Sequence, residues 1–118
     1  MILVDTSVWV GHLREGDERL RELLRDGEVL CHPFVVGELA CGNLVNRREI
    51  LALLSALPQA RVAEHAEVMH LVEIEGLQGR GLRWVDVHLL ASALLTRCPL
   101  WTRDKPLKQS AKVLRISA

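Results

Sequence analysis

The sequence has no excess of either charge, because 15 lysines and arginines balance 15 aspartates and glutamates. A chain without net positive charge cannot recruit a polyanion by overall attraction, so any contact with nucleic acid must come from a local basic patch. The sequence also lacks an apolar run of the roughly 20 residues that span a bilayer. The opening run "MILV" has no basic segment before it and ends at Asp5. We therefore expect neither a membrane segment nor a signal peptide.

Cysteine and aromatic residues are scarce, with three cysteines, three tryptophans, one phenylalanine and no tyrosine. The cysteines lack CxxC spacing and lie in apolar surroundings, so we expect reduced thiols and a cytoplasmic protein. The five histidines show no zinc-type spacing. Because aromatic residues are so few, we interpret the tryptophans as core or interface residues, although they could stack on bases.

The 118 residues, 49% of them apolar, have the size and composition of one domain over 1–118 with a single core. Short apolar runs predict strands over residues 2–4, 28–32, 98–104 and 112–117. Amphipathic or wholly apolar segments predict helices over residues 17–25, 33–44, 47–58, 66–81 and 84–95. This alternation predicts the α/β class, with a parallel sheet covered by helices on both faces.

Four acids do not lie on charged helix faces. Asp5 and Asp104 each follow a predicted strand, at the carboxyl end where open α/β sheets bind their ligands. Glu38 and Asp86 each lie in a helix so apolar that the carboxylate must face the core or a cleft. Burying a lone carboxylate is costly unless it is paired or bound to a metal, and acids close together repel one another.

These acids need a positive partner. No lysine or arginine lies within the apolar segments to supply it, although Arg103 and Lys105 flank Asp104. A divalent ion is the economical partner, and ligands that are all oxygen favour Mg²⁺ or Mn²⁺ over zinc. A single acid after a strand is weak evidence, however, because it is often the N-cap of the next helix, and this interpretation stays open for Asp5 and Asp86.

The order of the acids, with hydroxyls beside them, resembles a known family. "ILVDTSVWV", Glu38 in "VVGELACG", Asp86 in "WVDVHLLASALL" and Asp104 in "LWTRDK" resemble the four acidic motifs of PIN-domain ribonucleases, in particular the VapC toxins of toxin-antitoxin modules. The resemblance extends from Ile2 to about residue 105. It implies a PIN-like three-layer α/β/α fold with a central parallel sheet and metal-dependent endonucleolytic cleavage of RNA. It also implies a VapB-like antitoxin and a homodimer.

The resemblance further implies one catalytic and metal-binding cluster that holds Mg²⁺ or Mn²⁺. Its acids are Asp5, Glu38, Asp86 and Asp104, and its supporting polar residues are Thr6, Ser7 and Thr102. We expect Asp5 and Asp104 to ligate the ion directly or through water, and Asp86 to complete the site. Glu38 would bind a second ion or orient the attacking water, whose attack leaves a 5′-phosphate and a 3′-hydroxyl. Because Arg103 stands between Thr102 and Asp104, it stays open which polar group there supports the metal or the substrate.

Basic residues near these acids are the predicted contacts for RNA phosphates, and they are Arg80, Arg83, Arg103 and Lys105. Residues 97–118 hold six basic residues and one acid, which is the local patch that a neutral chain would need, unless it is only a solvated face. Leucine stripes between residues 17 and 57 exceed what so small a core can use. We expect a second copy or an antitoxin segment to cover part of them.

Two alternatives come from other functional classes. A catalytically silent PIN-like module would bind RNA or protein without cleaving, but such a scaffold has no physical use for four repelling acids. A phosphoacceptor signalling domain also places aspartates at strand ends, but it usually has a second acid beside the first strand, where this chain has Thr6 and Ser7. A Ser-His-Asp hydrolase is disfavoured because Ser7 has no histidine in a recognisable arrangement.

Overall fold

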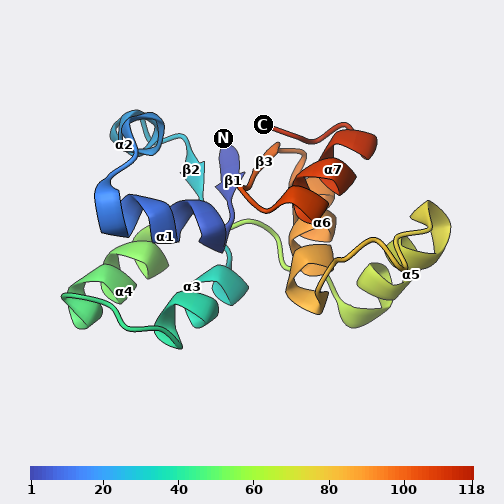
Figure 1. The fold of residues 1–118 in the computed structure, drawn as a ribbon, viewed down its shortest axis with the longest axis horizontal. Helices are drawn as coiled ribbons and strands as arrows, with labels where there is room; N and C mark the ends of the chain where they lie inside the picture. Colours follow the sequence, from blue (N-terminus) through green and yellow to red (C-terminus); the bar gives the residue numbers. More distant parts are fainter.

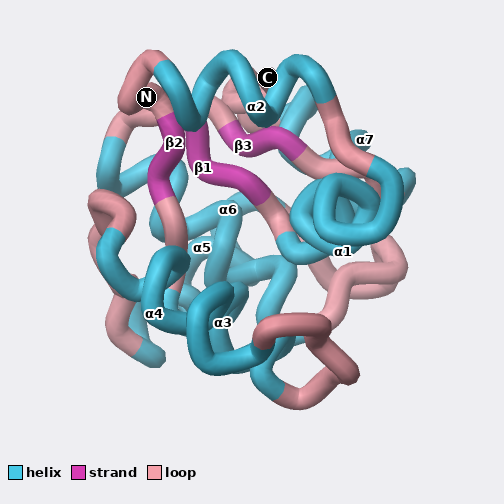
Figure 2. Tube along the Cα trace, turned by 90° about the vertical axis from the view of Figure 1, so that its left-hand side faces the viewer, coloured by secondary structure: helices cyan, strands magenta, loops and turns pink.

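The computed structural model describes residues 1–118, and it places a parallel sheet between two groups of helices (Figure 1). The three strands have the order β2-β1-β3 and are β1 (Ile2–Val4), β2 (Val29–Leu30) and β3 (Leu100–Trp101). Isolated parallel bridges, Cys31 with Gln59 and Leu100 with Ser117, continue the pairing beyond β2 and β3. The strands lie side by side with β1 in the middle (Figure 2).

Seven helices form the outer layers. To the left of the strands and below them in Figure 1 lie α1 (Thr6–Glu15), α2 (Glu18–Arg25), α3 (Pro33–Ala40) and α4 (Arg47–Ala56). To their right lie α5 (His65–Glu75), α6 (Trp84–Thr96) and α7 (Lys105–Val113). The predicted three-layer α/β/α fold is thus confirmed. None of the helices combines the length and the hydropathy needed to cross a bilayer.

The centre of the core is β1 and α6. Leu3 and Val4 of β1 are fully buried, because the strand is covered on both faces as its unbroken apolar run predicts. Eight consecutive residues of α6, from Asp86 to Ala93, are buried, which confirms the prediction of a helix apolar nearly all round. A helix buried to this extent holds its one acid in a fixed place.

The strands β2 and β3 lie on opposite sides of β1, so the order of the strands reverses at β1. The first crossover leads to β2, whereas a later one leads to β3 on the other side of β1. All pairs are parallel, so Asp5 after β1 and Thr102 after β3 emerge at the same edge. In open α/β sheets, ligands bind at the carboxyl edge where the strand order reverses.

Two helices differ from the prediction. Helix α1 follows Asp5 directly, in a segment for which the sequence predicts no element. Asp5 caps this helix by accepting a hydrogen bond from the Ser7 amide at 3.4 Å. The strand predicted over 112–117 is wrong: its first residues end α7, and only Ser117 pairs with β3. Asp104 caps α7 and Pro106 lies in its first turn, where proline is best tolerated. Both acids therefore lie between a strand and the helix that each of them caps.

Candidate active site

Asp5 is the most firmly held of the four acids. It is 3% exposed, and its backbone amide donates to the Trp101 carbonyl at 2.9 Å. Its Oδ2 accepts hydrogen bonds from Ser7 Oγ and Thr102 Oγ1, both at 2.7 Å, in addition to the Ser7 amide. Its Oδ1 accepts none. One oxygen of Asp5 is thus anchored, and the other is available to a ligand.

The directions of these hydroxyl bonds follow from their neighbours. Ser7 Oγ accepts a hydrogen bond from the Arg103 amide at 3.0 Å, and Thr102 Oγ1 accepts one from the Asp104 amide at 3.0 Å. Each hydroxyl therefore has its own hydrogen left to donate to Asp5 Oδ2. These donors suit an ionised carboxylate, and they hold it without cancelling its charge. We call Asp5, Ser7 and Thr102 the hydroxyl half of the site.

Glu38 and Asp86 are held differently. Glu38 Oε1 accepts a hydrogen bond from Thr6 Oγ1 at 2.8 Å, and Asp86 Oδ2 accepts one from the Arg83 amide at 2.8 Å. The remaining oxygens face one guanidinium: Arg83 Nη2 lies 3.5 Å from Asp86 Oδ1, and Arg83 Nη1 lies 4.0 Å from Glu38 Oε2. We call Glu38, Arg83 and Asp86 the arginine half.

Arg83 corrects one step of the sequence argument. That argument found no cation within the apolar segments, but Arg83 lies one residue before α6 and turns back onto the acids. The charge of Asp86 and its hydrogen bond raise the pKa of Arg83, and Glu38 and Asp104 add to the effect. Three of the four acids thus act on one guanidinium, which places them in the same neighbourhood.

Asp104 connects the two halves. Its amide donates to Thr102, whereas its charge acts on Arg83. Its Oδ2 caps α7 by accepting a hydrogen bond from the Leu107 amide at 3.2 Å, and its Oδ1 accepts none. N-capping, the alternative left open for an acid after a strand, is therefore compatible with a place in the site.

All four acids share one arrangement: one oxygen is anchored by an amide or a hydroxyl, and the other is free or faces Arg83. Anchoring one oxygen while exposing the other is typical of carboxylates that ligate metals. The donors are all oxygens, which fits a hard divalent ion. No three of the carboxylates converge closely enough to hold an ion with their side chains as they stand. The four carboxylates thus have the chemistry that a hard divalent ion requires. In the structure, the cation that faces Glu38 and Asp86 is the guanidinium of Arg83.

The predicted phosphate contacts lie in different surroundings. Arg83 is within the site, and Lys105 is exposed at the start of α7. Arg80 donates to the Gly76 carbonyl at 3.0 Å. The guanidinium of Arg103 pairs with Asp17, and it packs over Gly11, where any larger side chain would collide with it. Arg103 thus contributes its amide to the site while its charge is engaged elsewhere.

His32, which the sequence argument did not select, joins the helices of the arginine half. Its Nδ1 accepts a hydrogen bond from the Phe34 amide at 3.0 Å and so caps α3, the helix of Glu38. Its Nε2 lies 2.9 Å from Ser92 Oγ on α6, the helix of Asp86. Burial, together with the charge of His88, lowers the pKa of His32 to about 4. The available signal was its position before Pro33, at the end of a strand.

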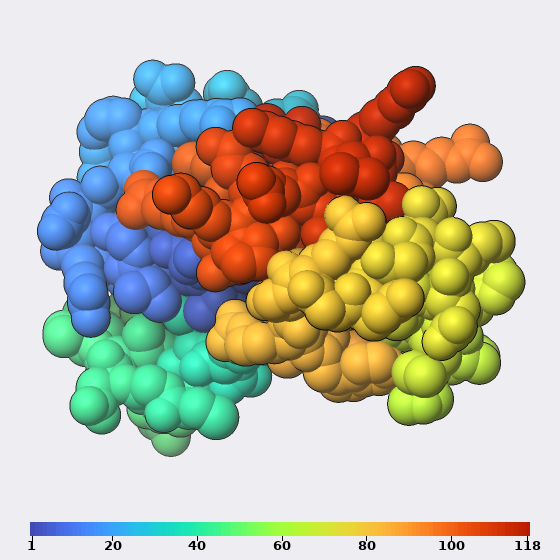
Figure 3. Space-filling model, turned by 45° about the vertical axis from the view of Figure 1, so that its right-hand side comes forward, coloured from blue at the N-terminus to red at the C-terminus, as the bar shows by residue number.

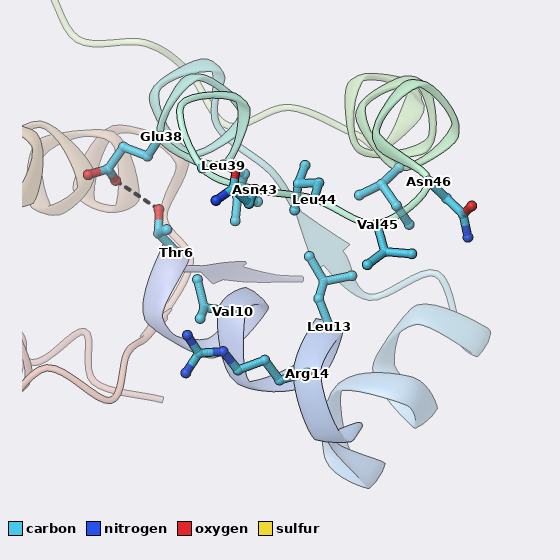
Figure 4. A pocket seen from close by; sticks show the side chains of 12 residues that line it. Thr6, Val10, Leu13, Arg14, Glu38, Leu39, Asn43, Leu44, Val45 and Asn46 are labelled. Atoms are coloured by element: carbon cyan, nitrogen blue, oxygen red, sulfur yellow. Dashed lines mark hydrogen bonds between the residues drawn. The ribbon is translucent and has the colours of Figure 1, made fainter.

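A groove leads away from the acids. It has a volume of about 630 Å³ and begins at Thr6 and Glu38, whose hydrogen bond is drawn in Figure 4. It continues between α1 and the segment that joins α3 to α4, where Val45 is 84% exposed. A second and almost wholly apolar groove of about 260 Å³ lies between α1, α2 and α4, with Leu53 on its wall. These grooves fit the predicted excess of apolar surface between residues 17 and 57.

On the other side of the molecule, the surface is formed by the C-terminal segment. Figure 3 shows this red segment lying between the blue N-terminal part and the yellow helix α5. The Arg103–Asp17 pair joins this segment to the part of the chain between α1 and α2.

With this geometry established, comparison with known proteins identifies the class. Residues 2–113 match the PIN domain family, and the chain belongs to that family. The chain is also similar to two curated relatives, each called Ribonuclease VapC32, from Mycobacterium tuberculosis strains CDC 1551 / Oshkosh and ATCC 25618 / H37Rv. Each is 55% identical over 109 residues, which cover 92% of this chain and 88% of the relative. The resemblance to VapC-type PIN ribonucleases is thus confirmed, and metal dependence is general among them.

Proposed function

We propose that the chain, as one domain over residues 1–118, is a metal-dependent endoribonuclease and the toxin of a VapBC-type toxin-antitoxin pair. The observation that supports this proposal most strongly is the arrangement that the four acids share, in which an amide or a hydroxyl anchors one carboxylate oxygen of each. The 55% identity to Ribonuclease VapC32 supports it.

The chemistry follows from the substrate. A phosphodiester is already anionic, so its hydrolysis requires neutralisation of charge and an activated water, both of which a divalent ion supplies when bound. Asp5 and Asp104 would hold the ion through the oxygens that accept no hydrogen bond, and Asp86 would complete the ligand set. Glu38, fixed by Thr6, would orient the water or hold a second ion. Arg83 and Lys105 would contact phosphates of the RNA.

The preferred ion is Mg²⁺ or Mn²⁺. Oxygen-only donors favour hard ions over zinc, and the four proposed ligands are all carboxylates. Attack by water, without help from the ribose 2′-hydroxyl, would leave a 5′-phosphate and a 3′-hydroxyl. The free thiols of the three cysteines suit the reducing cytoplasm, which we propose as the location.

Exchange of each acid for its amide tests the proposal. Asp5→Asn and Asp86→Asn keep the size of the side chain but remove a charged ligand. We expect both to stay folded and to lose two or more orders of magnitude in Mg²⁺- or Mn²⁺-dependent cleavage of structured RNAs, a scale typical of lost charge stabilisation.

The matched control is Glu49→Gln, on an exposed face of α4, which should cleave at the wild-type rate. Undiminished cleavage by both asparagine variants would show that the activity is a contaminant or lies elsewhere. Folded variants are verified by circular dichroism. If the wild-type protein binds structured RNA but never cleaves it, the silent binding module becomes the better description.

The antitoxin is proposed to cover the two grooves and to place an arginine on the free carboxylate oxygens. Leu53 is 60% exposed on the wall of the apolar groove, and Val113 on α7 is equally exposed but remote from it. Leu53→Glu should therefore weaken the complex with the antitoxin encoded next to this gene, measured by titration calorimetry, whereas Val113→Glu should not. If Leu53→Glu instead dissociates a homodimer of the toxin alone, the groove belongs to a second copy.

A further inference from the structure

The guanidinium of Arg83 occupies the place where a metal ion would meet the acids of the arginine half. Asp86 is satisfied by this one residue, whose amide holds Oδ2 and whose guanidinium lies 3.5 Å from Oδ1. Glu38 has one oxygen fixed by Thr6, and its other oxygen lies 4.0 Å from Arg83. The two oxygens that remain for a metal ligand are thus the two that the guanidinium faces.

Burial explains why a cation must be there in the absence of metal. The side chain of Asp86 is 2% exposed, and an unpaired carboxylate so deep is strongly unfavourable. The side chain of Arg83 is 68% exposed, so the guanidinium can swing into solvent without breaking a packed contact. The hydrogen bond to Oδ2 comes from the backbone amide of Arg83 and not from its side chain. Asp86 therefore keeps its orientation when the guanidinium leaves.

A guanidinium and a divalent ion cannot both sit on the same oxygens, since two cations a few ångströms apart repel each other strongly. We propose that Arg83 is the internal counter-ion of the acidic site, and that a divalent metal ion must displace its guanidinium from Asp86 and Glu38 in order to bind. This inference rests on the proposed function. Displacement also frees the guanidinium for the phosphate contact predicted from the sequence.

The hydroxyl half shows what a site without such a counter-ion looks like. Asp5 is held by two hydroxyls and an amide, and no arginine or lysine pairs with it. The nearest arginine in sequence to Thr102 is Arg103, and its guanidinium is engaged by Asp17. Competition between metal and guanidinium is therefore confined to the arginine half, and it depends on one side chain.

Titration calorimetry with MnCl₂ alone tests the inference. Arg83→Gln removes the competing charge, so Mn²⁺ should bind about tenfold more tightly, the scale expected for one unit charge removed from beside a divalent ion. Arg83→Lys keeps the charge and should stay within about twofold of the wild type. The matched control is Arg80→Gln, which removes a charge three residues away that bonds to the Gly76 carbonyl, and it should leave the affinity unchanged.

A second measurement uses the wild-type protein, in case Arg83→Gln fails to fold. In a ¹H–¹⁵N spectrum of the arginine side chains, the Nε–H signal of Arg83 should move when Mg²⁺ is added, while that of Arg80 should stay in place. The signals are assigned with Arg83→Lys and Arg80→Lys. An Arg83 signal that does not move at saturating Mg²⁺ would overturn the inference.

The outcomes separate this inference from the proposed function. If Mn²⁺ binds equally to the wild type and to Arg83→Gln but not to Asp5→Asn, the metal site stands and Arg83 does not compete for it. If Mn²⁺ binds more weakly to Arg83→Gln, the arginine supports the site instead of competing, and the inference fails. If no protein binds Mn²⁺, the metal site fails and the inference fails with it.

Discussion

The two halves of the site stabilise negative charge in opposite ways. In the hydroxyl half, neutral donors from Ser7 and Thr102 orient Asp5 and leave its charge intact. In the arginine half, Arg83 orients Asp86 and also offsets its charge. Under the proposed counter-ion role of Arg83, the two halves have different tasks: the hydroxyl half carries no competing cation, whereas the arginine half offers its carboxylates to a metal ion only when the guanidinium leaves.

Support beneath the two halves also differs. The hydroxyl half is fastened by the backbone of the sheet edge, through the amides of residues 103 and 104. The arginine half stands on α3 and α6, which His32 joins by bonding to Phe34 and Ser92. Since Nδ1 accepts from an amide, the neutral ring must carry its hydrogen on Nε2 and donate it to Ser92. A protonated ring would turn a second hydrogen toward the Phe34 amide.

The largest effect expected from this difference is a dependence on pH. The pKa of His32 is about 4 in the folded protein, below the ordinary value of 6.5, so the unfolded chain takes up a proton first as the pH falls. The stabilisation is complete above pH 6.5 and is lost progressively toward pH 4. Between pH 6.5 and 5 the loss should be about 2 kcal/mol, measured by urea unfolding.

The variant His32→Asn can still cap α3 but cannot titrate, so its loss of stability over the same range should be smaller by about that amount. His88, whose pKa is also lowered by burial and by His65, would account for part of what remains. The control is His70→Gln, in which an exposed histidine is removed and the wild-type pH dependence should persist. If the free energy of unfolding of His32→Asn falls with pH as steeply as that of the wild type, His32 is not the source of the pH dependence.

A more local effect, on metal binding and cleavage rather than on the stability of the whole domain, is expected when the hydroxyl half is weakened. Thr102→Val keeps the shape of the side chain but removes one donor to Asp5 and leaves the Asp104 amide without its acceptor. We expect a loss of roughly 10- to 100-fold in Mn²⁺ affinity or in RNA cleavage, the range found when residues that orient metal ligands are replaced. Calorimetry and cleavage assays measure these losses.

Thr96→Val is the matched control, since Thr96 also accepts a hydrogen bond from a backbone amide, that of Arg61, but at the far end of α6. It should leave both the affinity and the cleavage rate unchanged. If both valine variants lose the same Mn²⁺ affinity or cleavage rate, the missing hydroxyl acts by lowering the stability of the whole domain. The orienting role of Thr102 in the hydroxyl half would then be wrong.

Much of this arrangement could be predicted from the sequence. The apolar run before Asp5 and the apolar helix around Asp86 indicated a strand end and a buried helix for these two acids, because a segment that is apolar throughout is a strong signal of burial. Thr102 was selected through the family resemblance, in the motif that also contains Asp104. Its bond to Asp5 could not be predicted, since it depends on β1 and β3 being neighbours, although 97 positions separate the two residues.

For three other features, the sequence pattern was misleading or gave no indication of the structure. Helix α1 was missed because Val8, Trp9, Val10 and Gly11 are weak helix formers, so the segment after Asp5 gave no clear helical signal. The strand predicted over 112–117 relied on apolar residues such as Val113, which is 60% exposed at the end of α7. The contact of Arg83 with the acids could not be predicted from the sequence. A side chain just outside a helix can point in many directions, and only the fold brings this one toward Glu38.

The bond between Asp5 and Thr102 also has a consequence for protein synthesis. The ribosome makes Thr102 97 positions after Asp5. A growing chain can therefore contain Asp5, Glu38 and Asp86 while the hydroxyl of Thr102, which orients Asp5, is still missing. If domains fold as their last strands become available, this edge of the sheet is completed only when β3 and the residues after it have emerged.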